Sequence, residues 1–262
     1  MYVFVCQSNL FNRSSPMKII RVCKGFTPEQ CEVIIGADFG DTLGWKCSRL
    51  IPELCKYLMG CFNPDSCELD FGARGKVPIS LQSVVNVLGV PMGSNPISYH
   101  MDTGATRTMV DMFGIKDWKQ PSLAFLEKQL GPKHPADRIF LRKFCIYLTC
   151  SVFAPTTAVG ISPRCYPSLI NTDGIRRLNW PKFIIDIMIQ TARAKGKKSW
   201  FKACMPYLMV SSCFFIFVVF QYSFCVLLVE IGPLYKCCGK PLRCFFSFFC
   251  RFYMLILWKL TQ

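Results

Sequence analysis

The sequence predicts a mainly α-helical, multi-helix globular domain with one small β-hairpin, followed by a hydrophobic C-terminal helix. Apolar residues recur at helical spacing in several segments, and residues that favour helix caps precede those segments. The tail is set apart because residues 203–229 contain no charged side chain. The chain is therefore predicted to comprise a poorly ordered start at 1–13, a helical domain at 14–208 and a hydrophobic tail at 209–262.

Three helices are expected before the hairpin, over residues 17–23, 28–35 and 48–61. The second has the clearest start, because Thr27 can cap it and Gln30 completes a capping box. In the third, leucine recurs every four residues and Pro52 falls in the first turn, where proline is tolerated. These signals predict that the N-terminal part of the domain is helical.

A hairpin and a short helix follow these three helices. Extended stretches at 66–71 and 76–79 flank the sequence Gly-Ala-Arg-Gly, which predicts a small β-hairpin. Ser80 then caps a helix that runs through Leu88. Residues 93–120 are expected to be loop-rich, because glycine and proline recur through them.

The remaining helices of the domain are expected over residues 122–130, 137–153 and 179–194. The helix at 137–153 is apolar nearly all round, which predicts a central, buried position. The helix at 179–194 is amphipathic, with Asn179 as its cap. Its apolar face consists of Trp180, Phe183, Ile184, Ile187 and Met188.

Composition limits the environment and partners of the chain. The formal net charge is +15, of which the last 52 residues contribute five Lys or Arg and one Glu. A basic surface favours polyanions, so nucleic acid and anionic lipid are the expected classes of partner. The chain has 17 cysteines but no CxxC pair and no recognisable secretory signal. We therefore expect reduced thiols in an intracellular setting and no structural metal site.

The sequence contains no catalytic constellation. His100 and His134 are the only histidines, and each lies in a loop-like stretch without a motif around it. Four aspartates in turn-like contexts are expected to form caps and turns rather than an acidic metal cluster: Asp38, Asp41, Asp102 and Asp111. No catalytic residue, cofactor-binding residue or metal ligand is therefore predicted, and the chain is not expected to be an enzyme.

The strongest basic cluster lies between the last amphipathic helix and the uncharged run. Its cations are Arg193, Lys195, Lys197, Lys198 and Lys202. With Trp200 and Phe201 beside them, they suit contacts with nucleic-acid phosphates supported by base stacking. The same pattern is found in nuclear-localisation patches and on the cytoplasmic flank of a membrane span. A solvated helix end without a ligand is the remaining interpretation.

Four landmarks occur in a characteristic order along the domain. They are Asp38-Phe39-Gly40, the segment from Val87 to Gly93, Ala154-Pro155-Thr156-Thr157, and Asn179-Trp180 with Phe183 and Asp186. In this order and at these distances they resemble the plant mobile domain family, whose members are transposon-derived and often labelled aminotransferase-like. The resemblance covers about residues 14–208.

The resemblance implies a helical domain of mobile-element origin with an interaction role, in contact with nucleic acid or a nuclear protein complex. It implies no catalytic residues. Pyridoxal phosphate enzymes need a Schiff-base lysine, a pyridinium partner and a phosphate cup on a larger fold, and the sequence marks none of them. Some relatives are expected to carry a cysteine protease domain further downstream, for which this chain is too short. A nuclear location is expected for a correctly spliced member.

The uncharged run supports two interpretations of the tail. About 20 apolar residues span a bilayer, and residues 207–229 meet this length, which predicts a single transmembrane helix, membrane localisation and contact with lipid. Alternatively, residues from about Val210 onward are a retained intron. Residue types with uridine-rich codons make up 34 of the last 52 residues, and Val210-Ser211 matches the in-frame translation of a common splice-donor sequence.

Overall fold

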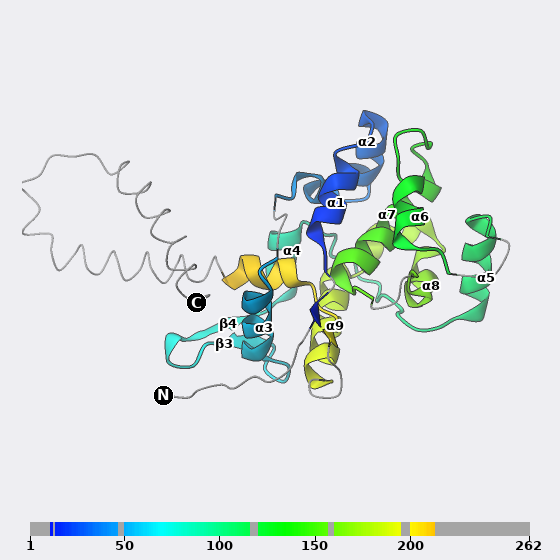
Figure 1. Cartoon of the computed structure of the whole chain (residues 1–262). Coiled ribbons are helices and arrows are strands. Elements are labelled where there is room, and N and C mark those ends of the chain that lie inside the picture. Colours follow the sequence, from blue (N-terminus) through cyan, green and yellow to red (C-terminus); the bar gives the residue numbers. More distant parts are fainter. Residues whose placement is uncertain are drawn as a thin grey trace, which may run out of the picture. The chain divides into compact units, whose positions relative to one another are not determined.

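The computed structural model describes residues 11–12, 14–46, 50–115, 120–156, 160–194 and 200–212. The chain divides into two compact units, Met1–Ser212 and Cys213–Gln262, and every described residue belongs to the first. This unit is mainly helical, as predicted, with one small antiparallel sheet (Figure 1).

The first two helices form close to their predicted bounds, and the second begins at its predicted cap. Helix α1 spans Pro16–Cys23, and α2 spans Pro28–Gly36. The capping box of α2 is present, because the Thr27 hydroxyl accepts from the Gln30 main-chain N–H and the Gln30 side chain accepts from the Thr27 N–H. A 3₁₀ turn, η1, follows at Gly40–Gly44.

Helix α3 and the sheet differ in detail from their predictions. Helix α3 spans Pro52–Cys61 and so starts four residues after the predicted start at 48. Proline disfavours helical geometry in the residue before it, and Ile51 is extended. The predicted hairpin has become a three-stranded antiparallel sheet, because Phe62–Asn63 pairs with its first strand. The strands are β2 (Phe62–Asn63), β3 (Glu68–Asp70) and β4 (Lys76–Pro78), with the turn η2 (Gly72–Arg74) between the last two.

The helix after the sheet was predicted, but the next one was not. Helix α4 spans Leu81–Leu88 with Ser80 as its cap. Helix α5 spans Thr103–Met112, inside the segment that was expected to be loop-rich. The prediction failed because threonine and glycine are weak helix formers. Burial of Ala105, Met109 and Val110, together with the Asp102 cap, stabilises the helix.

Helix α7 forms the centre of the unit. It spans Arg138–Leu148 and continues as a π-helical turn, η3, over Thr149–Phe153. Its side chains from Phe144 to Leu148 are fully buried, which confirms the predicted central position. It packs against α2, against α6 (Leu123–Gln129) and against α8 (Tyr166–Leu169) (Figure 1).

The last part of the domain leads into helix α9. The 3₁₀ turns η4 (Pro163–Cys165) and η5 (Thr172–Arg177) lie on either side of α8. Helix α9 spans Trp180–Arg193, and the Asn179 side chain accepts from the Lys182 main-chain N–H, as predicted. Helix α9 packs against α4.

A short parallel strand pair joins the two ends of the unit. Strand β1 (Phe11–Asn12) pairs with β5 (Trp200–Phe201). Residues 11–12 are the described part of the segment that was predicted to be a poorly ordered start. The other residues of that predicted segment, 1–10 and 13, lie outside the described residues.

The start of the predicted membrane span is part of the folded unit. Residues 205–212 are helical, and the side chains of Met205, Tyr207 and Leu208 are fully buried. The Tyr207 hydroxyl lies 2.7 Å from the Ser83 hydroxyl in α4, and the Cys55 thiol in α3 donates to Met209 Sδ at 3.7 Å. In Figure 1 this helix is drawn in gold beside α3 and α4.

The rest of the predicted span, residues 213–229, lies outside the described residues. Within the described part of the chain, none of the helices is both long enough and apolar enough to cross a bilayer.

Candidate functional site

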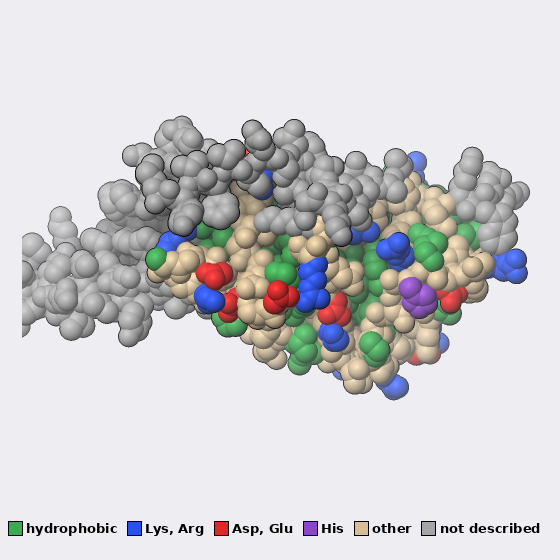
Figure 2. All heavy atoms as spheres, turned by 90° about the horizontal axis from the view of Figure 1, so that it is seen from below, with side chains coloured by type: hydrophobic (Ala, Val, Ile, Leu, Met, Phe, Trp, Pro, Cys, Tyr) green, Lys and Arg blue, Asp and Glu red, His purple; other side chains and the backbone are tan. Residues whose placement is uncertain are grey.

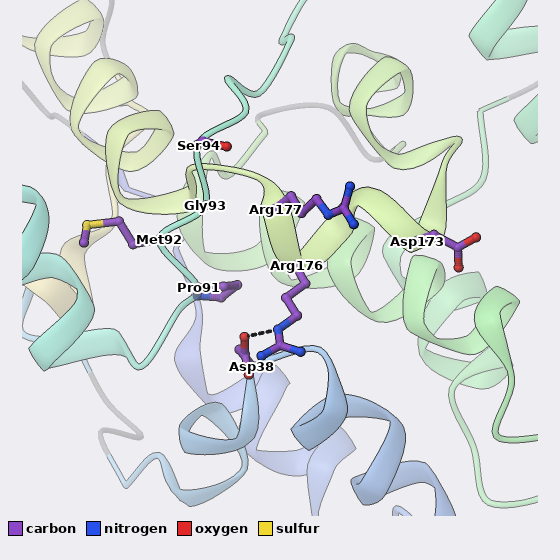
Figure 3. A pocket seen from close by; sticks show the side chains of 8 residues that line it. All are labelled: Asp38, Pro91, Met92, Gly93, Ser94, Asp173, Arg176 and Arg177. Atoms are coloured by element: carbon purple, nitrogen blue, oxygen red, sulfur yellow. Dashed lines mark hydrogen bonds and ion pairs between the residues drawn. The ribbon is translucent and has the colours of Figure 1, made fainter.

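A surface groove of about 560 Å³ lies where three segments of the unit meet. Asp38 comes from the turn after α2, residues 91–94 from the loop after α4, and Asp173, Arg176 and Arg177 from η5 (Figure 3). The groove is lined by charged side chains from the first and third segments and by main chain, Pro91, Met92 and Ser94 from the second. It brings together residues separated by more than a hundred positions.

Main-chain hydrogen bonds hold two walls of the groove together. The Gly93 N–H donates to the Leu178 carbonyl at 3.1 Å, and the Asn95 N–H donates to the Arg177 carbonyl at 2.9 Å. The Asn179 N–H returns a bond of 2.7 Å to the Asn95 carbonyl. A Cβ atom on Gly93 would lie 1.9 Å from the Arg177 carbonyl oxygen, so only glycine allows this approach.

An aromatic cluster around Trp180 packs beside residues that neighbour the groove in the sequence. This side chain is 1% exposed, and its indole N–H donates to the Ile175 carbonyl in η5 at 3.2 Å. Its ring meets Phe39 at a centroid distance of 5.2 Å and Phe153 at 5.9 Å. Phe39 directly follows Asp38, and Ile175 directly precedes Arg176. The cluster therefore fixes the main chain beside both charged walls of the groove.

The loop after α4, which lines the groove, makes a second close approach, to Asp41 in η1. Gly89 has a φ of 61°, a left-handed conformation that ends the helix. A Cβ atom there would lie 2.1 Å from the Asp41 Cβ. Three of the sequence landmarks thus contribute directly to one region: Asp38-Phe39, the segment from Gly89 to Gly93, and Asn179-Trp180.

Ion pairs neutralise most of the charge in the groove. Arg176 Nε lies 2.5 Å from Asp38 Oδ2, and Arg138 Nη1 lies 3.2 Å from Asp173 Oδ2. Asp38 has a φ of 62°, which aspartate tolerates better than most residues. Arg177 is the exception, since it forms no ion pair or side-chain hydrogen bond with another described residue.

The ion pairs of the groove belong to a wider pattern. In the part of this face that is not drawn in grey, Figure 2 shows acidic and basic side chains interspersed, without a continuous patch of one sign. The paired groups around the groove are largely exposed, and such pairs contribute only about 0–1 kcal/mol each. These ion pairs therefore fix the positions of side chains but contribute little to the free energy of unfolding.

The structure describes two of the five cations of the predicted basic cluster. Arg193 ends α9 and lies 3.0 Å from Asp65 Oδ1. Lys202 is half-buried, and its carbonyl accepts a hydrogen bond from the Thr191 hydroxyl of α9. Lys195, Lys197 and Lys198 lie outside the described residues.

The structure describes all six of the other residues that were considered for chemistry, two histidines and four aspartates. His100 is exposed, while the main chain of His134 accepts a bond from Gln30 at 2.9 Å. Asp102 caps α5 through the Ala105 N–H, as expected, and Asp38 pairs with Arg176. Asp41 lies in η1, and Asp111 is an exposed residue of α5.

Burial affects the ionisation of several cysteines. Burial raises the pKa of the Cys23 thiol to about 12, and it also raises the pKa of Cys145 and Cys165. A thiol reacts as its thiolate, so burial disfavours the reactive form of these three groups. Among the described residues, no group of three or more His, Cys, Asp or Glu is arranged to hold a metal ion.

Sequence reasoning missed the charged side of the groove. Arg176 and Arg177 lie just before the Asn179-Trp180 landmark, separated from it by Leu178, but two adjacent arginines are too common to indicate a site. Their position in the sequence was the signal that could have found them, because residues next to a landmark that packs in the core are also held in place.

Comparison with known proteins assigns the chain to a family. A family model with the description "Domain of unknown function (DUF8566)" matches residues 12–209, which is most of the chain. No curated protein and no solved structure shows significant similarity to it. The match starts in β1 and ends in the helix at 205–212, so it includes every landmark that lines the groove. The chain therefore belongs to the DUF8566 family of domains of unknown function.

Proposed function

We propose that this chain is a non-enzymatic interaction domain that binds nucleic acid in the nucleus through the basic segment 193–202. We further propose that it shares the transposon-derived origin of the plant mobile domain family. The order of the landmarks supports the second proposal. Three of the four landmarks contribute to the groove or to the aromatic cluster around Trp180, which is a physical reason for their occurrence in one domain.

One contact carries the proposal of nucleic-acid binding. The hydrogen bond from the Thr191 hydroxyl to the Lys202 carbonyl ties the far end of the basic segment to the last turn of α9. Arg193 lies in that same turn. The contact therefore brings two of the five cations of the segment, Arg193 and Lys202, to the same end of α9. Concentrated cations release counterions from a phosphate backbone and so favour binding.

The test compares two double variants of equal charge in the full chain. We expect Lys197→Glu with Lys198→Glu to weaken binding to a short DNA duplex by about tenfold or more, since two phosphate contacts become repulsions. The control is Lys128→Glu with Lys133→Glu, two exposed lysines outside the segment. Fluorescence anisotropy at low salt measures both.

The control separates a local interface from net charge. The proposal predicts a much smaller loss of affinity for the Lys128/Lys133 variant than for the Lys197/Lys198 variant. Equal losses would show that only the total charge matters, and an absence of binding at low salt would reject nucleic acid as the partner.

A second candidate function, a single-span membrane protein with a cytosolic helical domain, is favoured by the uncharged run. Residues 203–212 of that run lie in the folded unit, which leaves 213–229 as the uncharged part outside it. These 17 residues are at the lower limit for a spanning helix, which needs about 17–25. Extraction of cell membranes with alkaline carbonate tests this candidate, because a spanning chain stays in the pellet and a released chain rejects the span.

A further inference from the structure

The two successive arginines of η5 are in different electrostatic situations. Arg176 reaches Asp38, whereas the Arg177 side chain points away from Asp38 on the other side of the turn (Figure 3). Asp173, the other carboxylate of the groove, pairs with Arg138. The groove therefore contains two carboxylates that already have partners and one guanidinium, that of Arg177, with no partner among the described residues.

The main chain that carries Arg177 is held on both sides. Its carbonyl accepts from the Asn95 N–H, and the next carbonyl, that of Leu178, accepts from the Gly93 N–H. Ile175 is anchored through the Trp180 indole. Because the main chain is fixed, a ligand needs to order only the end of the side chain, which lowers the entropic cost of binding.

The geometry points to a ligand with several anionic oxygens. A guanidinium presents a planar fork of donors that fits two oxygens of a phosphate. We propose that the groove binds a phosphate group, which Arg177 holds and which competes with Asp38 for Arg176. Met92, which is 49% exposed at the groove, offers an apolar surface to the group attached to the phosphate. The phosphate is either a free anion or part of a nucleic-acid strand.

This site is separate from the basic segment proposed above. All the residues that line the groove precede the first residue of α9 in the sequence. The basic segment begins at the last residue of α9, Arg193. A helix of 14 residues is about 21 Å long. The groove and the basic segment therefore share no residue, and the two proposals can fail independently.

Three substitutions distinguish the site from a general charge effect. Arg177→Ala removes the unpartnered guanidinium. Asp38→Asn removes the competing carboxylate and keeps the backbone, since asparagine also tolerates the left-handed φ of 62° at this position. Arg164→Ala is the matched control, because Arg164 is an exposed arginine that does not line the groove.

The first measurement titrates inorganic phosphate into the full chain by calorimetry, at constant ionic strength set with sodium chloride. We expect saturable binding that is about tenfold weaker in Arg177→Ala, because a charge-assisted pair of hydrogen bonds is lost. Asp38→Asn should bind phosphate about threefold more tightly, since a weak exposed ion pair no longer competes. Arg164→Ala should match the wild-type protein.

The second measurement repeats the series with a single-stranded oligonucleotide. If free phosphate does not bind but Arg177→Ala weakens oligonucleotide binding more than Arg164→Ala does, the phosphate belongs to a strand and the proposal holds. If Arg177→Ala and Arg164→Ala behave alike with both probes, the proposal is overturned. Loss of oligonucleotide binding in the Lys197/Lys198 variant, with phosphate binding unchanged, bears on the basic segment alone.

Discussion

Gly93 shows how one residue can decide the geometry of the groove. Its main chain approaches the Arg177 carbonyl so closely that a Cβ atom would lie 1.9 Å from the oxygen. The neighbouring atoms are main chain, so they cannot rotate away as a side chain would. Any substitution must therefore separate the two walls of the groove and break the hydrogen bonds between them.

We predict that Gly93→Ala lowers the free energy of unfolding by about 2–3 kcal/mol, because the added methyl group forces the walls apart. The control is Gly60→Ala in α3, where no atom lies within 4 Å of the added Cβ. Alanine is the better helix former, so this control should be neutral or stabilising by up to about 1 kcal/mol. Urea unfolding of both variants provides the comparison, and a neutral Gly93→Ala would contradict the close packing.

Lys76 illustrates a charge effect on the small sheet. Its ammonium lies 2.8 Å from Glu68 and 3.4 Å from Asp70, and its hydrogen bond holds the pKa of Glu68 below the usual value. A depressed carboxyl pKa stabilises the fold above the unfolded pKa, and this contribution is lost as pH falls through the folded pKa. Lys76→Met should therefore raise the pKa of Glu68, as measured by NMR titration. An unchanged pKa would show that the pair does not persist in solution.

At the scale of elements, capping residues predicted helices better than composition did. Thr27, Ser80 and Asn179 each cap a helix at the expected position. Ser122 and Asp137, the first residues of two expected helices, also cap them. Composition misled for α5, where glycine and threonine concealed an apolar face that only tertiary packing stabilises. Sequence alone also missed η4, α8 and η5, since short turns leave too few residues for a periodic pattern.

The candidate site was predictable only in part, for a related reason. Its anchors, Trp180 and Phe39, lie in landmarks that the sequence displays. Its charged wall depends on how η5 is held against the loop at 93–95, and these contacts join distant residues through main-chain atoms. Main-chain pairing of this kind leaves no mark on residue identity apart from the glycine it requires.

The helix at 205–212 provides a test of where the domain ends. We predict that Leu208→Ala lowers the free energy of unfolding of the full chain by about 3 kcal/mol, since it opens a cavity at a fully buried position. Val210→Ala in the same helix, at a side chain that is 40% exposed, should cost less than about 1 kcal/mol. Thermal unfolding distinguishes them, and equal, small effects would place the helix outside the cooperative unit.

At the scale of the whole molecule, the uncharged run from 203 to 229 has two parts. The first ten residues belong to the unit that contains the family domain, and 213–229 lie in the second unit. A retained intron from about Val210 remains our hypothesis for the origin of the tail. Sequencing the transcript tests it, because reads that splice after Met209 support the hypothesis, and a transcript without any junction there, together with a stable full-length protein, rejects it.

The central claim is that the cations of the basic segment 193–202 bind a phosphate backbone. The most direct test is the salt dependence of duplex binding, since the logarithm of the association constant falls with the logarithm of salt in proportion to the number of phosphates contacted. Changing Lys197 and Lys198 to Glu should reduce the magnitude of this slope by about two, while the Lys128/Lys133 control leaves it unchanged. An equal slope for the wild-type protein and the Lys197/Lys198 variant would contradict the account.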